Sequence, residues 1–101
     1  MARVALLSSD LLFGSKVQGA LRRAGHEPVA FGEPAEVLIV DLTDQVEARL
    51  EAVADARLPT LAFYAHVDRR TRALAEEAGV ELVVPRSRMA REGAAMVDSL
   101  L

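Results

Sequence analysis

Short apolar runs alternate with segments of helical periodicity along the whole of this 101-residue chain. Runs of this length and composition are typical of strands that are buried on both faces of a sheet. The expected strands are Val4–Ser8, Pro28–Phe31, Val37–Val40, Leu61–Tyr64 and Leu82–Val84. Strands that alternate with helices indicate a parallel sheet with helices on both faces. The sequence therefore predicts an α/β domain of three layers.

Four helices are predicted from apolar residues that recur near a period of 3.6. They are expected over residues 12–24, 45–56, 69–78 and from about 90 to 101. The expected N-terminal caps of the first three are Asp10, either Thr43 or Asp44, and Asp68. Gly25 and Gly79 stand where a helix C-terminal glycine belongs. In the last helix the residues expected to face the core are Ala94, Val97 and Leu101.

The interval between Phe31 and Val37 breaks the alternation, because it holds only the five residues from Gly32 to Glu36. A parallel crossover normally takes about a dozen residues and usually contains a helix. We therefore expect the second helix to be missing or reduced, which leaves apolar sheet surface uncovered. An uncovered surface of this kind usually meets a partner, so a homodimer or another protein partner is predicted at this face. The alternative is that the extended segment itself covers the sheet.

Composition and charge exclude several functional classes. At 101 residues and 51% hydrophobic, the chain predicts one domain, residues 1–101, with one core. The net charge of -3 gives no basic field for nucleic acid, and no run approaches a membrane span. The absence of cysteine excludes disulfides and thiolate metal sites, and no metal or cofactor is expected. A cytoplasmic protein is predicted. The absence of Asn and Cys, the scarcity of Met, and the excess of arginine over the single lysine, Lys16, suit a thermophile or a GC-rich genome.

Asp41 ends the most apolar run of the chain, Glu36–Asp41. The carboxyl end of a buried parallel strand is where open α/β sheets place their ligand crevice. Asp41 follows the third strand, Leu58-Pro59 comes before the fourth strand and Ala78-Gly79-Val80 comes before the fifth. In these features and in the order of its elements, the chain resembles a response-regulator receiver domain over nearly its whole length. The resemblance implies a flavodoxin-like sheet of strand order 2-1-3-4-5.

Receivers carry an acidic pair after the first strand, a phosphoryl-accepting Asp after the third, a Ser or Thr after the fourth and a Lys after the fifth. Asp41 matches the acceptor, and Asp10 matches an acid that often follows the pair. The other positions hold different residues, namely Ser8 and Ser9, Tyr64 and Pro85. Three segments further resemble a group of small stand-alone receiver-like proteins: Asp10–Lys16, His66–Asp68 and Pro85–Met89.

Phosphoryl transfer to a carboxylate needs a divalent cation held by hard oxygen ligands and a positive charge for the developing anion. Ser8 and Ser9 are poor substitutes for acids in such a site. The sequence therefore predicts a degenerate pseudo-receiver of two-component signalling, without enzymatic activity, in which Asp41 accepts hydrogen bonds from the following loop. It would bind a protein partner. A true phospho-accepting receiver that uses Asp41 is the alternative.

A second group of polar side chains is expected at the same rim of the sheet. Its members are Asp10, Lys16, Tyr64, His66, Arg86, Ser87 and Arg88. Bases beside a hydroxyl and an imidazole suit the phosphate or carboxylate of a small molecule or nucleotide, which predicts an anion sensor as a further alternative. In the alternative interpretation the group binds no ligand. Lys16 then forms a salt bridge with Asp10 or Asp41, and the arginines are solvated.

Overall fold

A computed structural model describes all residues, 1–101. Five strands form one parallel sheet in the order β2-β1-β3-β4-β5. They are β1 (Arg3–Leu7), β2 (Glu27–Ala30), β3 (Val37–Asp41), β4 (Thr60–Tyr64) and β5 (Leu82–Pro85). The helices are α1 (Leu11–Arg23), α2 (Val46–Ala56), α3 (Arg69–Glu77) and α4 (Arg86–Leu100). The predicted fold class and strand order are confirmed.

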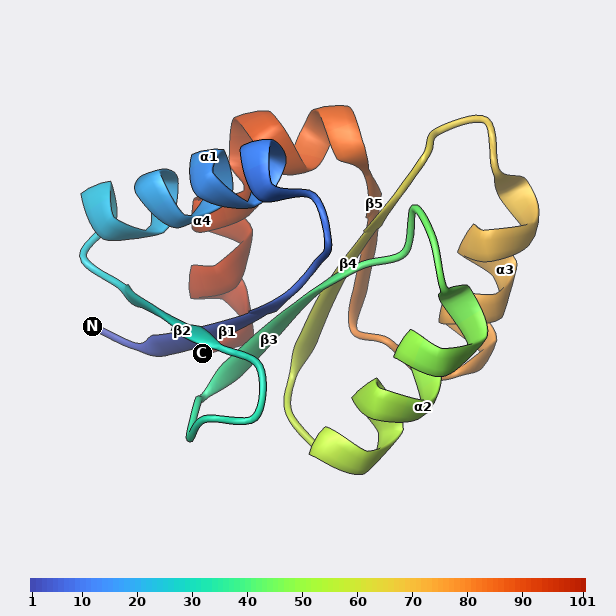
Figure 1. Cartoon of the computed structure of the whole chain (residues 1–101), viewed down its shortest axis with the longest axis horizontal. Helices are drawn as coiled ribbons and strands as arrows, with labels where there is room; N and C mark the ends of the chain where they lie inside the picture. The colour runs from blue at the N-terminus through green and yellow to red at the C-terminus, as the bar shows by residue number, and fades with distance from the viewer.

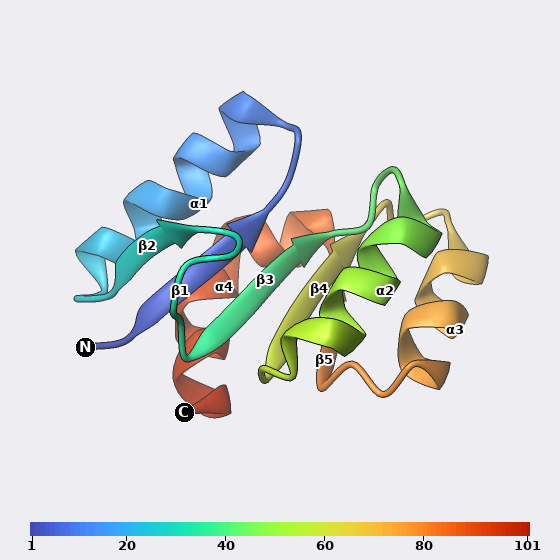
Figure 2. The ribbon, with the colours of Figure 1, turned by 60° about the horizontal axis from the view of Figure 1, so that its bottom comes forward.

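The helices divide into two layers, with α1 and α4 on one face of the sheet and α2 and α3 on the other (Figures 1 and 2). The central strands supply side chains to both layers, because successive strand residues point to opposite faces. In β4, Phe63 joins a cluster of 13 buried residues beneath α1 and α4. Its neighbour Tyr64 joins a cluster of six on the other side, and a cluster of three lies nearer β2. We call the face of the sheet with the cluster of 13 the α1–α4 face, and the face with the two smaller clusters the α2–α3 face.

Two of the predicted helix caps are confirmed. Asp10 and Asp68 each accept a hydrogen bond from the main-chain amide three residues later, at 3.0 Å. Gly25 and Gly79 follow the ends of α1 and α3 with φ angles of +86° and +82°, a region that an L side chain rarely adopts. The sequence therefore sets the bounds of α1 and α3 through local chemistry.

The cap predicted for α2 is wrong. Gln45 precedes α2 in a left-handed conformation with φ of +50° and makes no capping bond. Thr43 and Asp44 are engaged elsewhere, with Asp41 and Arg49 respectively. These competing partners explain why neither residue caps the helix.

The predicted start and inner face of α4 also need correction. The helix begins at Arg86, directly after β5, and not at about Ala90. The apolar period extends back through Gly93 to Met89, which is buried, so the first turn belongs to the helix. Leu101 was expected to face the core but is 60% exposed, because α4 ends at Leu100 and the last residue lies beyond its final turn.

The prediction that the second receiver helix is missing is confirmed. Residues 31–36 connect β2 to β3 without any helix, and a turn at Gly32 has φ of +100°. Because β1 lies between β2 and β3, this short connection crosses the face of β1 as it returns to the start of β3 (Figure 2). The α2–α3 face therefore lacks a helical cover beside α2.

The N-terminus is tied to the C-terminal helix by a buried histidine. His26 Nδ1 accepts a hydrogen bond from the Ala2 amide at 3.2 Å, and its Nε2 lies 2.7 Å from Asp98 Oδ1. Since Nδ1 is the acceptor, the Nε2 atom carries the hydrogen that is donated to Asp98. This contact joins the start of β1 to the end of α4.

None of the four helices has the length and apolar character to cross a membrane.

Candidate functional site

The carboxylate of Asp41 lies at the carboxyl end of β3 and has donors on both oxygens. Its side chain is almost fully buried, at 2% exposure. Oδ2 accepts a hydrogen bond from Ser8 Oγ at 2.7 Å. Oδ1 accepts from the Thr43 amide at 2.8 Å and from the Thr43 hydroxyl at 2.5 Å. Asp41 therefore accepts hydrogen bonds from the following loop, as the sequence predicts, and one further bond from the loop after β1.

Ser8 stands where receivers carry an acid, and its hydroxyl performs a different task. It donates to Asp41 and accepts from the Asp10 amide at 3.1 Å. An ionised carboxylate at this position has no hydrogen to donate. A second carboxylate here would repel that of Asp41, whereas the Ser8 hydroxyl donates to it and holds the ends of β1 and β3 together.

A buried arginine, Arg49 of α2, lies beside this pair. Its guanidinium donates to the main-chain oxygen of Asp41 at 2.8 Å, to Asp44 Oδ1 at 2.5 Å and to Ser9 Oγ at 2.6 Å. The residue is only 6% exposed. One side chain therefore links α2 to the loops that follow β1 and β3.

The sequence prediction did not include Arg49, although a signal for it exists. The residue follows Val46 by three positions and precedes Val53 by four, which places it on the inner face of an amphipathic helix. An arginine on an apolar face is expected to find acceptors within the protein, because a buried charge without partners is strongly unfavourable.

The residues around Asp41 do not fit a divalent cation. Receivers imply such an ion, which prefers several carboxylate or carbonyl oxygens. No three acidic, histidine or cysteine side chains come close enough together to hold a metal ion. Ser8 directs a hydrogen, and not a lone pair, at Asp41, and the fixed cation of the neighbourhood is the Arg49 guanidinium.

The ion pair predicted for Lys16 is wrong, because the arginine at the start of α4 takes its place. Arg86 Nη2 lies 2.8 Å from Asp10 Oδ2, and its guanidinium carbon lies 4.3 Å from the centre of the Phe13 ring. Lys16 forms no ion pair. Since α4 begins at Arg86, this arginine is held at the strand ends and reaches Asp10 directly.

The predicted rim residues come together only in part. Lys16, Arg86 and Ser87 line one open hollow of about 420 Å³ next to the Phe13 ring. The other members are placed differently: Arg88 pairs with Glu92 at 3.3 Å, His66 is exposed on the loop after β4, and Tyr64 is 5% exposed within the apolar cluster under α3. The rim thus holds a small basic hollow at the junction of α1 and α4.

The capping carboxylate of α3 lies in the loop that follows β4, at the same edge of the sheet. Asp68 accepts hydrogen bonds from the hydroxyl of Thr71 at 2.6 Å and from its amide at 3.0 Å. Both hydrogen bonds stabilise the charged form and lower the pKa of Asp68 below its ordinary value, and the bond from the Thr71 hydroxyl has the larger effect.

Comparison with known proteins defines the class of fold. No protein-family model and no curated protein matches this sequence. Among solved structures, the crystal structure of a response regulator from Thermotoga maritima superimposes with a TM-score of 0.79. It is 15% identical, and the match covers 97% of this chain and 95% of that one. The chain therefore has the receiver-like, flavodoxin-like fold over almost its whole length.

Proposed function

We propose that the protein is a stand-alone, degenerate receiver of the cytoplasm, which acts in two-component signalling by binding a protein partner and not by accepting a phosphoryl group. The observation that supports this most directly is that Asp41 is buried and accepts three hydrogen bonds from within the protein. Its Oδ2 atom accepts a hydrogen bond from Ser8, and its Oδ1 atom accepts two from Thr43.

Phosphorylation of Asp41 would require three changes at once. A carboxylate oxygen would have to lose its donors, a divalent cation would need carboxylates that Ser8 and Ser9 do not supply, and the place of the receiver lysine is held by Pro85. Stabilisation of the charge that develops on the transferred group is a large part of such catalysis. The cation beside Asp41, Arg49, donates to the main-chain oxygen of Asp41, to Asp44 and to Ser9, and not to the Asp41 carboxylate.

Intact-mass spectrometry after incubation with acetyl phosphate and Mg²⁺ tests this proposal. The mass is expected to stay unchanged, while an active receiver treated in parallel gains one phosphoryl group. The Asp41→Ala variant is the control for the position of any adduct. A stoichiometric adduct on the wild type that disappears in Asp41→Ala would make the protein a true phospho-acceptor.

The partner is proposed to bind where the helix between β2 and β3 is missing. Either a second copy of the chain or another protein would cover this part of the α2–α3 face. Light scattering at micromolar concentration tests the first of these, because a dimer mass indicates a homodimer and a monomer mass eliminates it.

A second candidate function is the binding of a small anion, and one observation favours it. Lys16, Arg86 and Ser87 converge on the basic hollow beside Phe13. Phosphate or sulfate is expected to raise the melting temperature of the wild type and not that of a Lys16→Ala, Arg86→Ala double variant. Arg88→Ala is the matched control, since Arg88 pairs with Glu92 away from the hollow. Equal responses in all three proteins would eliminate this function.

A further inference from the structure

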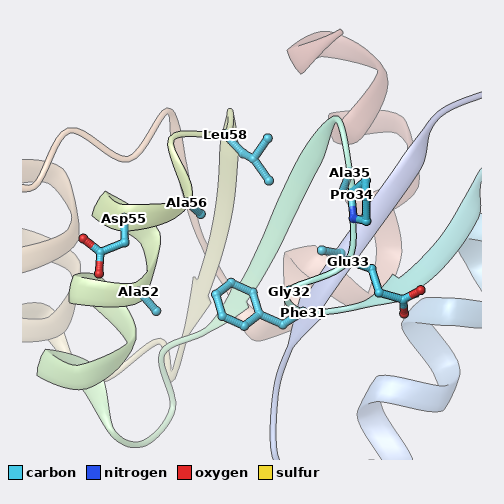
Figure 3. Close-up of a pocket in the computed structure, with 10 residues that line it drawn as sticks. Phe31, Gly32, Glu33, Pro34, Ala35, Ala52, Asp55, Ala56 and Leu58 are labelled. Atoms are coloured by element: carbon cyan, nitrogen blue, oxygen red, sulfur yellow. The ribbon is translucent and has the colours of Figure 1, made fainter.

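A groove lies on the α2–α3 face at the place of the missing helix. Its volume is about 540 Å³. Figure 3 shows its two sides, the 31–35 segment on one and α2 on the other, with the Phe31 ring directed toward Ala52. Ala5 of β1 and Leu58 also line it. The groove is therefore a gap between α2 and the 31–35 segment. The expected uncovered sheet surface is not found beneath it, because Ala5 is only 2% exposed and Ala35 of the connection packs against the cluster to which Ala5 belongs.

The side chains that line the groove are mostly small and apolar. They include Ala5, Ala35, Ala52 and Ala56, while Phe31 remains 39% exposed. Packed helices lie 8–10 Å apart when the side chains between them are small enough. A lining of alanines thus allows a second helix to lie close against α2, in the layer where receivers place one.

Asp55 of α2 lines the groove and ends an acidic row on this helix. Glu47, Glu51 and Asp55 follow one another at intervals of four residues along α2 and are all exposed. None of them takes part in an ion pair. Like charges at this spacing destabilise a helix by a few tenths of a kcal/mol per pair. A cationic partner would remove this repulsion.

The charges also discriminate between occupants. No basic side chain lines the groove, so a phosphate or nucleotide finds no counter-charge there. A second copy bound about a two-fold axis would place the same patch against itself, and with it the acidic row of α2. Like charges that face each other across an interface are unfavourable. A different, basic partner meets neither obstacle.

We propose that this groove binds an amphipathic helix of a partner protein, with its apolar face against Ala52, Ala56 and Phe31 and with Lys or Arg side chains beside Glu51 and Asp55. The helix would occupy the layer of the missing receiver helix. This inference rests on the proposed function, because it names the class of partner that the degenerate receiver binds.

Selection from a displayed library of helical peptides of about 18 residues tests the proposal, since shorter isolated helices are marginal in water. Peptides enriched on the wild-type protein are expected to be amphipathic and rich in Lys or Arg. Their affinity is expected to fall about tenfold for a Glu51→Lys, Asp55→Lys variant and to weaken with added salt. Glu77→Lys on α3 is the matched control, because Glu77 is exposed and unpaired like the two test residues.

A second variant keeps the test independent of charge. Ala56→Leu places a larger side chain in the groove and is expected to weaken the same peptides about tenfold, since the helix loses its close approach. Circular dichroism verifies that each variant is folded. Enrichment of acidic peptides, equal affinity for all variants, or no enrichment at all would overturn the proposal. So would a dimer mass that falls to monomer in Ala56→Leu, since a second copy would then be the occupant.

The failure of this inference can be told apart from the failure of the proposed function. A phosphoryl adduct on Asp41 would overturn the degenerate receiver whether or not peptides bind the groove. Failed peptide selection without an adduct would overturn the groove as a partner site and leave the degenerate receiver in place.

Discussion

The two faces of the sheet differ in how completely they are covered. On the α1–α4 face, two helices of 13 and 15 residues enclose the cluster of 13 buried side chains. The rings of Phe13 and Phe63 meet there at 5.0 Å, and His26 ties β1 to α4. On the α2–α3 face the helices have 11 and 9 residues, and the buried side chains divide into clusters of six and three.

This difference separates stability from recognition within one small domain. The α1–α4 face holds the largest cluster of buried apolar side chains, and burial of apolar surface is the dominant favourable contribution to folding. The α2–α3 face is complete only under its two helices, and it keeps an accessible groove beside them. A partner can therefore bind without disturbing the larger cluster.

Truncation of a leucine on each face gives the largest expected contrast. Leu21→Ala removes a fully buried side chain of α1 and is expected to lower the free energy of unfolding by about 3 kcal/mol. Leu58→Ala removes a half-buried side chain at the groove and is expected to cost about 1 kcal/mol, because less surface is lost from burial. Urea unfolding measures both. Equal losses in the free energy of unfolding would mean that the two faces contribute alike to stability.

Removal of the arginine that links α2 to the strand ends gives the next effect. Arg49→Met keeps the apolar stem and deletes the donors to Asp41, Asp44 and Ser9, so a loss of about 2 kcal/mol in the free energy of unfolding is expected. The control is Arg91→Ala, an exposed residue, with an expected change within about 0.5 kcal/mol. If denaturation by urea gives the same value for both, Arg49 does not hold this edge together.

Enlarged side chains should separate the faces by their free space. Val97→Leu adds a methylene to the enclosed α1–α4 face and is expected to cost about 1 kcal/mol through overpacking. Ala56→Leu extends into the groove and is expected to change the free energy of unfolding by less than about 0.5 kcal/mol. A comparable loss from both substitutions in chemical denaturation would argue against an open groove in solution.

The smallest effect concerns the cap of α3 and depends on pH. The folded state lowers the pKa of Asp68, so this carboxylate stabilises the protein above its unfolded pKa of about 4 and loses that contribution as the pH falls through its folded value. Asp68→Asn keeps a capping oxygen but does not titrate. The difference in melting temperature between wild type and variant should be constant above about pH 5 and shrink below about pH 4. A difference independent of pH would show that the charge of Asp68 is not involved.

Much of the fold follows from local sequence signals. The strands, the missing helix and the caps at Asp10 and Asp68 depend on periodicity, on connection length and on residues within three positions of each other. The role of Asp41 as an acceptor for the Thr43 amide is of the same kind, since the two residues are neighbours in the loop. Such features need no knowledge of the tertiary structure.

The rest of the site depends on contacts between distant segments. The bond from Ser8 to Asp41 joins residues 33 positions apart and requires the register of β1 against β3. The choice of Arg86 over Lys16 as the partner of Asp10 depends on where α4 begins, which the sequence prediction placed about one turn too late. Long basic side chains reach several acceptors, so proximity in the fold decides between them.

The connection of residues 31–36 also has a consequence for how such domains change over evolution. Doubling the length of a surface loop costs only about 0.6 kcal/mol of closure entropy. An insertion that carried its own helix could place that helix against the groove beside α2. Gain or loss of a single loop segment can thus convert a domain with an open groove beside α2 into one whose own helix fills that groove. All five strands keep their pairing in both forms.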